Sequence, residues 1–126
     1  MSGMRRFFSG ITETGDRAPE DWLRSRYYRG RSLEAGDQLL QLPKQHPSFK
    51  FVHYDKERGE VMFEYRNPLG FTHDIVITIY EITPIRLAVD IHAAIRSRMF
   101  DFGWNRKIVG IIYSYLDQKL TKDTKS

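Results

Sequence analysis

The sequence has no cysteine, and this absence excludes several kinds of site. Disulfide bridges, thiolate-bound metal ions and thiol nucleophiles all require cysteine. The chain also lacks an apolar run long enough to predict a membrane span or a signal peptide. These two absences predict a cytoplasmic protein without disulfides.

Several motifs of catalytic and nucleotide-binding sites are absent as well. There is no G-x-S-x-G turn to present a nucleophilic serine, and no H-E-x-x-H spacing for zinc. Neither of the glycine-rich phosphate loops, G-x-G-x-x-G and G-x-x-x-x-G-K-[ST], occurs. These absences favour a non-enzymatic protein without excluding an enzyme, and they predict neither a cofactor nor a metal ion.

The charge balance gives only a weak indication of partners. The 20 lysines and arginines exceed the 16 aspartates and glutamates, for a net charge of +4, and the excess is spread along the chain. A basic surface in solvent explains this balance more readily than binding to RNA, DNA or an anionic lipid surface. With 126 residues, 40% of them apolar and 13% aromatic, the chain predicts one folded domain over residues 1–126.

The clearest periodicity lies in the C-terminal third. From Ile85 to Arg96, apolar residues alternate with mostly polar ones, which predicts a strand with one buried face. From Ile108 to Leu120, the apolar residues instead recur on one side of a helix. Residues 97–105 are the predicted loop between this strand and this helix.

The rest of the chain predicts a second helix and three more strands. Ser32 is a suitable N-cap for a helix that ends before Pro43. Three alternating segments separated by turn-forming residues predict strands at 49–54, 60–66 and 74–82. Short turns make neighbouring strands antiparallel. The predicted fold is therefore α+β: a helix, a four-stranded antiparallel meander and a C-terminal helix, with both helices packed on one sheet face.

The two ends of the chain are predicted to contribute little regular structure. Residues 1–31 show little periodicity and are predicted to be an irregular N-terminal segment. Residues 121–126 are polar and are predicted to be a frayed tail.

The loop before the last helix is the first candidate for a binding site. In a structural interpretation, Asp101 or Asn105 caps the helix, Gly103 takes a positive φ, and the aromatic residues close the core. In a functional interpretation, the helix N-terminus binds an anion with help from Arg106 and Lys107. The structural interpretation is favoured. The candidate binding residues are Arg98, Asp101, Gly103, Trp104, Asn105 and Arg106.

A second candidate is the segment 24–31, where arginines and tyrosines interleave. Arginine binds phosphate groups and tyrosine stacks on bases, so the segment predicts binding to nucleic acid or an anionic surface. The favoured alternative is an extended segment or edge strand with its tyrosines packed inward and its arginines in water, because no known RNA-binding signature surrounds it. The candidate residues are Arg24, Arg26, Tyr27, Tyr28, Arg29 and Arg31.

Asp90 and His92 are the third candidate, because they share one face of the last predicted strand. A carboxylate beside an imidazole can orient it as a general base or a metal ligand. Such a site needs a third convergent group, and Arg86 and Arg96 on the same face would repel a cation. Ordinary polar packing is therefore favoured over a small enzyme, and no metal site is predicted.

The C-terminal third contains a set of short motifs: Val89-Asp90-Ile91-His92, Ser97-Arg98, Asp101, Gly103, Asn105-Arg106-Lys107 and Leu116-Asp117-Gln118-Lys119-Leu120. With these motifs, the sequence resembles the bacterial family called domain of unknown function 1499. The resemblance implies a small α+β domain and no particular activity.

The sequence thus predicts a non-enzymatic domain that binds a ligand or a protein partner. The predicted binding surface is the open sheet face or the loop around Asp101 and Arg106. A second copy of the chain is one candidate partner, because a homodimer would cover apolar side chains on that face. Binding to nucleic acid or an anionic surface and a small enzyme remain the alternatives.

Overall fold

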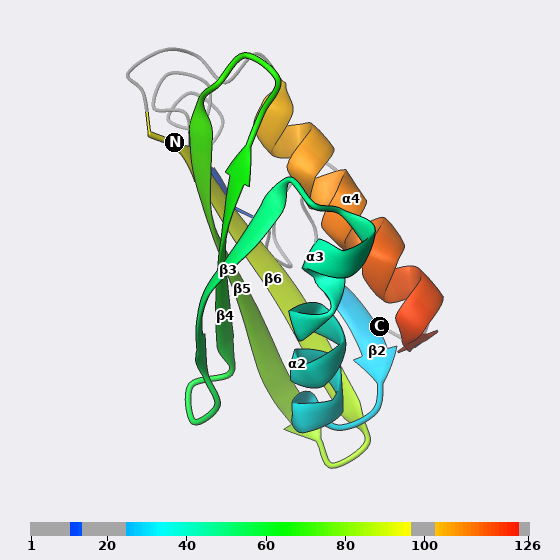
Figure 1. Ribbon diagram of the computed structural model, residues 1–126. Helices are drawn as coiled ribbons and strands as arrows, with labels where there is room; N and C mark the ends of the chain where they lie inside the picture. Colours follow the sequence, from blue (N-terminus) through cyan, green and yellow to red (C-terminus); the bar gives the residue numbers. More distant parts are fainter. Residues whose placement is uncertain (1–10, 14–24, 97–102, 124–126) are drawn as a thin grey trace.

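The computed structural model describes residues 11–13, 25–96 and 103–123, and its main feature is one antiparallel sheet accompanied by helices (Figure 1). The described elements, in chain order, are β1 (Ile11–Glu13), β2 (Arg26–Arg29), α2 (Ser32–Leu40), α3 (Leu42–Gln45), β3 (Phe49–Asp55), β4 (Glu60–Arg66), β5 (Thr72–Thr83), β6 (Arg86–Ile95), α4 (Trp104–Lys119) and β7 (Thr121–Lys122).

The α+β class and the antiparallel meander are confirmed. Strands β3, β4, β5 and β6 pair in that order, each antiparallel to the next. The prediction of a four-stranded sheet is wrong, because the described sheet has seven strands in the order β3-β4-β5-β6-β2-β7, with β1 also paired to β6. The additional strands are two to four residues long, too short to show a period-two pattern.

The N-terminal segment is therefore not irregular throughout. β2 pairs antiparallel with the start of β6, where Tyr28 lies opposite Leu87, and β1 pairs antiparallel with the end of β6. The C-terminal tail is also more ordered than predicted, because β7 pairs with β2. Asp123 fixes this end of the chain: its backbone N–H donates to the Tyr27 carbonyl at 2.9 Å, and its carboxylate lies 3.0 Å from Arg86 Nε.

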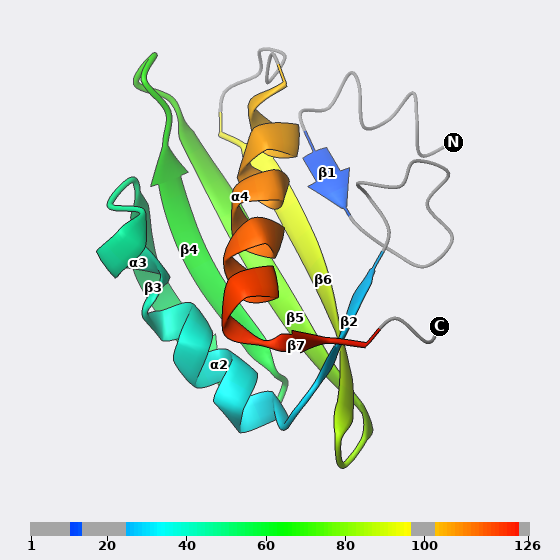
Figure 2. The ribbon, with the colours of Figure 1, turned by 90° about the vertical axis from the view of Figure 1, so that its right-hand side faces the viewer.

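The core lies between the sheet and the helices. Apolar side chains at alternate positions of β4, β5 and β6 form one cluster with apolar side chains of the three described helices. Figure 2 shows α4 lying along the sheet, with α2 and α3 beside α4. The α2 and α4 helices also touch, because the Tyr115 hydroxyl donates to the Gln38 carbonyl. Full burial of one core leucine or isoleucine stabilises the fold by about 1.5–3 kcal/mol.

The helix starts differ from the predicted ones. The N-cap of α2 is Arg31, not Ser32, and no side chain caps this helix. The N-cap of α4 is Gly103, whose φ of 82° confirms the predicted positive φ. This helix begins at Trp104, earlier than the apolar stripe predicted. No helix among the described residues is long and apolar enough to cross a bilayer.

Candidate functional site

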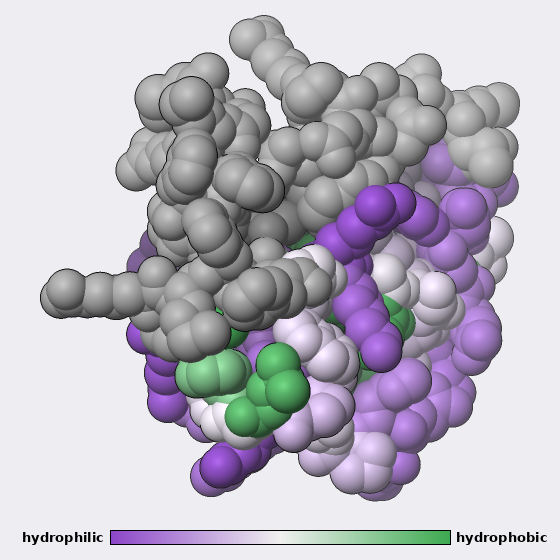
Figure 3. Space-filling view, turned by 90° about the horizontal axis from the view of Figure 1, so that it is seen from above, coloured by the Kyte–Doolittle hydropathy of each residue, from purple (hydrophilic) through white to green (hydrophobic). Residues whose placement is uncertain are grey.

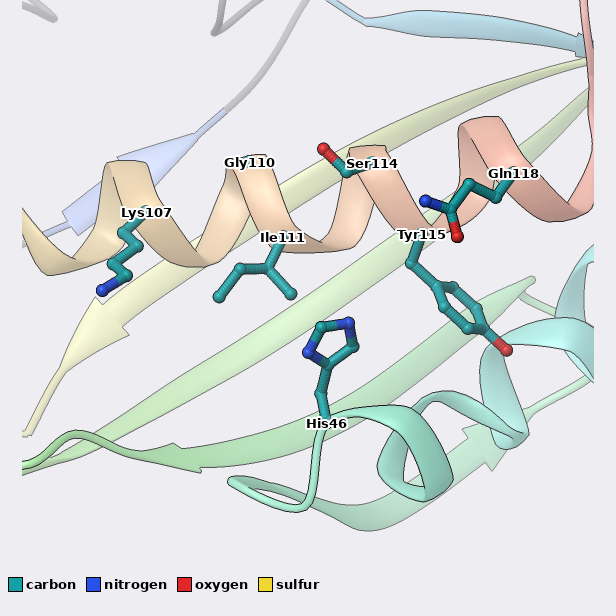
Figure 4. A pocket seen from close by; sticks show the side chains of 7 residues that line it. All are labelled: His46, Lys107, Gly110, Ile111, Ser114, Tyr115 and Gln118. Atoms are coloured by element: carbon teal, nitrogen blue, oxygen red, sulfur yellow. The ribbon is translucent and has the colours of Figure 1, made fainter.

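A groove of about 390 Å³ lies between the end of α3 and the exposed side of α4 (Figure 4). His46, the C-cap of α3, points its ring towards α4, beside Ile111 and Tyr115. We call this feature the α3–α4 groove. It is lined by His46, Lys107, Gly110, Ile111, Ser114, Tyr115 and Gln118.

The lining of the α3–α4 groove has apolar and basic parts. Ile111 and the Tyr115 ring supply apolar surface, whereas Ser114 and Gln118 supply hydrogen-bonding groups. The charged group is the ammonium of Lys107, which also lies 4.7 Å above the Trp104 ring. Among the residues that the structure describes, no aspartate or glutamate lines the groove. Its volume falls within the range of small-molecule sites, and its charge suits an anion.

Gly110 lies in the groove although the fold does not require glycine there. Apart from the adjacent backbone of α4, no atom of the described residues would lie within 4 Å of a Cβ at this position, and the residue is exposed in the middle of α4. Glycine in a helix interior costs about 0.5–1 kcal/mol relative to alanine. The other helical glycine, Gly36 of α2, has a packing reason, because a Cβ there would stand 2.0 Å from the Tyr54 hydroxyl oxygen. The described residues thus give no packing reason for glycine at position 110, although glycine lowers the stability of the helix.

Tyr115 contributes a ring face to the groove and not a reactive hydroxyl. Its side chain is almost fully buried, and its hydroxyl donates to the Gln38 carbonyl. Burial raises the pKa of the Tyr115 phenol, so it stays protonated at neutral pH. The groove therefore combines binding groups without an evident general base other than His46.

A fully buried polar cluster lies near the start of α4, on its inner side. His73 of β5 contacts Asn67 through Nε2 at 3.0 Å and Asn105 through Nδ1 at 2.8 Å. The Asn67 Oδ1 accepts the backbone N–H groups of Leu69 and Phe71, so its Nδ2 is the donor to His73 Nε2. His73 is therefore neutral, with its proton on Nδ1. Because His73 and Asn105 are 0% exposed, we assign the cluster a structural role.

This cluster was not predicted from the sequence. The sequence predicts Asn105 as a helix cap or as a residue of the binding loop, but no side chain caps α4, and the Asn105 side-chain oxygen accepts a hydrogen bond from His73. The signal that was available is the Asn67-Pro68-Leu69-Gly70 turn, since asparagine often folds back onto nearby backbone N–H groups in turns. The contact between Asn67 and the rest of the cluster depends on the tertiary fold.

The predicted loop site is described only in part. Arg98 and Asp101 lie outside the described residues. Trp104 is partly buried and packs against Tyr65, with ring centroids 6.4 Å apart, and Arg106 is exposed. None of the described candidates lines the α3–α4 groove, but the neighbouring Lys107 does.

The arginine–tyrosine segment does not form a single surface, because β2 alternates between the two sheet faces. Arg26 and Tyr28 point towards α4, where both contact the Asp117 carboxylate at 2.7 Å. Tyr28 is fully buried, and this burial, followed by its hydrogen bond to Asp117, raises its pKa well above the ordinary value. Tyr27 is on the opposite face, under the Arg86 guanidinium at 4.5 Å.

The favoured alternative for this segment is confirmed in that β2 is a strand, but β2 pairs with both β6 and β7 and is therefore not an edge strand. One tyrosine and one arginine point inward, and they are joined by an ion pair between Arg26 and Asp117. Arg29 and Arg31 are exposed, whereas Arg24 lies outside the described residues. Of the candidate arginines that the structure describes, Arg29 and Arg31 are thus the ones exposed enough to contact an anionic surface.

Asp90 and His92 lie on the outer face of the sheet, and both are half-buried. Asp90 accepts a hydrogen bond from the Ser25 hydroxyl. Further along this face, Arg96 forms ion pairs with Asp74 and Glu64. Across the described parts of the chain, no three histidine, aspartate or glutamate side chains gather closely enough to hold a metal ion.

The comparisons with known proteins give no relative: no family model, no curated protein and no solved structure matches this chain. The resemblance to domain of unknown function 1499 therefore stays a prediction.

Proposed function

We propose that this chain is a non-enzymatic binding domain that holds a small, elongated carboxylate in the α3–α4 groove. In this proposal, α3 and α4 pack on the same face of the sheet, and the α3–α4 groove between them faces solvent. The observation that supports the proposal is Gly110, a helix glycine that lines the groove and has no neighbour among the described residues that requires glycine.

The shape and chemistry of the groove favour a ligand with an acidic head and an apolar body. Its lining runs along α4 from Lys107 to Gln118, a distance of about 16 Å at the rise of an α-helix. Lys107 and His46 can hold the carboxylate, because an ammonium and an imidazole both donate hydrogen bonds. Ile111 and the Tyr115 ring offer apolar contact to the remainder. Most small-molecule sites combine apolar lining with few polar groups in this way.

An NMR titration tests the proposal with two probes, decanoate as an elongated carboxylate and benzoate as a compact one. We expect decanoate to shift the backbone amide signals of the groove residues of α4, and to bind more tightly than benzoate. Lys107→Met should weaken decanoate binding about tenfold, since a hydrogen bond to a charged group is lost. Gly110→Leu should block binding, because its side chain would occupy the groove.

Arg106→Met is the matched control, because Arg106 is the neighbouring exposed cation and does not line the groove. It should leave the affinity for decanoate almost unchanged. If Lys107→Met and Arg106→Met weaken binding equally, the attraction is only the general positive charge of the protein. The proposal is also wrong if neither carboxylate shifts the α4 signals.

A further inference from the structure

The strand β3 forms one edge of the sheet (Figure 1). It is the first strand in the order β3-β4-β5-β6-β2-β7, so none of the described strands pairs with its outer side. Its seven residues make it much longer than β7, the two-residue strand at the other end of that order. The outer side of an edge strand presents backbone N–H and C=O groups to which another strand can bind.

The backbone N–H of Phe51 points towards this open side. The Arg66 N–H donates to the Ser48 carbonyl at 3.2 Å, which makes Ser48 and Arg66 a hydrogen-bonded pair. Such pairs alternate with non-bonded pairs along antiparallel strands. The N–H of Lys50 therefore points to β4, and the N–H of Phe51 points outward, where a further strand can accept its hydrogen bond.

Exposed apolar side chains accompany this outward N–H. Phe51 is 44% exposed and Val52 is 49% exposed. The other large apolar residues that are exposed lie on α2, in the β4–β5 turn and at the β5–β6 hairpin: Leu33, Leu69, Tyr80, Ile82 and Ile85. Figure 3 views the end of the molecule that carries the β4–β5 turn, where the described surface is mostly hydrophilic. On β3, by contrast, exposed apolar side chains coincide with an open strand edge.

A β-bulge in the middle of β3 interrupts its alternation. Phe51 lies opposite Phe63 of β4, and His53 lies opposite Met62, so Val52 is an extra residue without a partner on β4. An extra residue shifts the side chains that follow it to the other face of the sheet. The bulge therefore decides which side chains of β3 share a face.

The bulge brings two opposite charges to one face and two aromatic rings to the other. Lys50 and Asp55 both lie opposite glutamates on the outer face of β4. Phe51 and Tyr54 both lie opposite buried apolar residues of β4, on the core side. In a regular strand, residues three or five positions apart would point to opposite faces.

We propose that β3 pairs antiparallel with the β3 of a second copy of this chain, about a two-fold axis between Val52 and His53. In this register, Lys50 of each copy lies opposite Asp55 of the other copy, and two ion pairs form across the axis. Two backbone N–H groups of the β3–β4 turn already hold the Asp55 carboxylate, each at 3.1 Å. Opposite charges on directly opposed residues stabilise a strand pair.

The charges and the bulge together favour a second copy over an unrelated strand. The same register places Phe51 of one copy opposite Tyr54 of the other, and aromatic cross-strand pairs are also stabilising. Each residue meets one on its own face of the sheet, because the bulge of one copy compensates for the bulge of the other. Bulges and charges ordinarily keep edge strands from pairing. A regular strand would match neither the spacing nor the charges of β3.

Sedimentation velocity of the full chain at increasing concentrations tests the proposal. We expect a monomer–dimer equilibrium with weak affinity, because one strand pair makes a small interface. Lys50→Glu should weaken the dimer about tenfold, since both ion pairs become repulsive, and Asp55→Lys should weaken it similarly. A mixture of these two variants should form a mixed dimer about as stable as the unmodified one, because each opposed pair again combines an acid with a base.

Arg29→Glu is the matched control, because it changes the net charge equally at an exposed position of β2, three strands away from β3 in the sheet. It should leave the dimer unchanged. If Asp55→Lys does not fold, Asp55→Asn replaces it, since the amide oxygen can still accept the N–H groups of the turn; this variant should weaken the dimer about threefold. Equal effects of Lys50→Glu and Arg29→Glu would overturn the proposal.

Hydrogen exchange locates the interface independently of the substitutions. As the dimer forms, the outward N–H of Phe51 should exchange more slowly, whereas the N–H of Lys50, which points to β4, should not change. A dimer that slows exchange elsewhere and not at Phe51 uses another surface, such as the open sheet face, and would overturn the proposal. A chain that stays monomeric at every concentration would also overturn it. None of these outcomes bears on the α3–α4 groove.

Discussion

Asn105 and Gly110 lie on the same helix, little more than one turn apart, and they meet different surroundings. Asn105 is fully buried, and its side-chain oxygen accepts a hydrogen bond from His73. Gly110 is exposed, and beyond the adjacent turns of α4 no described residue would come within 4 Å of a Cβ there. Buried contacts fix the inner side of α4. On the side that faces the groove, there is space at Gly110 that packing leaves unfilled.

Substitutions on the two sides of α4 should therefore have different effects. On the inner side, a change removes buried hydrogen bonds or packing, and the free energy of unfolding falls. On the groove side, a change alters the surface that a ligand would contact, with little loss of stability. A helix that looks uniform in the ribbon thus has a buried side that supports the fold and a more exposed side that lines the groove.

The largest effect is expected on the inner side, at His73. The substitution His73→Leu would remove two buried hydrogen bonds, one from the Asn67 amide and one to the Asn105 side-chain oxygen. Each buried polar group left without a hydrogen bond costs about 1–3 kcal/mol, so the free energy of unfolding should fall by about 2–5 kcal/mol. Urea denaturation measures this change.

His53→Leu is the matched control, because His53 is exposed on β3. Its effect should stay within about 0.5 kcal/mol. An equally small change for His73→Leu would show that the buried cluster adds no stability, and the division between the two sides of α4 would lose its main support. Decanoate binding by the folded fraction of His73→Leu should be normal.

A second prediction for the inner side concerns pH, through Tyr28. Burial and the hydrogen bond to Asp117 raise the pKa of Tyr28, so the folded protein keeps this proton at pH values where the unfolded chain loses it. Stability should therefore fall as pH rises above about 10, by up to about 1.4 kcal/mol per pH unit from this one group. At neutral pH, Tyr28→Phe should cost about 1–2 kcal/mol through the lost hydrogen bond.

At high pH, the hydrogen bond of Tyr28 and the ionisation of Tyr28 change the free energy of unfolding in opposite directions. Phenylalanine cannot ionise, so the stability gap between the unmodified protein and Tyr28→Phe should narrow between about pH 9 and pH 11. Urea denaturation across this range measures the gap. A constant gap would mean that Tyr28 ionises equally in both states, and that its burial does not control its proton.

The fold could be predicted where apolar residues repeat with a clear period. The four strands β3 to β6 and the helix α4 follow from such repeats, because one face of each is buried in the core. The β2 strand could not be recognised in this way, since an arginine occupies one of its inward positions. This arginine, Arg26, pairs with Asp117, which lies 91 residues later in the chain. No local sequence pattern reveals this ion pair.

The site was harder to predict, because it is assembled from separate segments. The α3–α4 groove needs His46 from a proline-containing loop and an exposed stripe of α4, which meet only in the folded protein. The one local signal was Gly110, a glycine in the middle of a predicted helix with no turn nearby. Lys107 was noted as a helper in anion binding at the helix start, but its place in a groove depends on α3.

The smallest effects test the comparison most directly, because they use the same substitution at two helical glycines. Gly110→Ala should raise the free energy of unfolding by about 0.5–1 kcal/mol, since alanine favours the helix and nothing obstructs its methyl group. Gly36→Ala should lower it by about 1–2 kcal/mol, because the methyl group displaces the Tyr54 ring end and overpacking outweighs the helical gain. Thermal or urea unfolding of the two variants gives the signs. If both substitutions destabilise the protein, Gly110 has a structural role after all, and the stability lost to glycine no longer argues for a ligand in the groove.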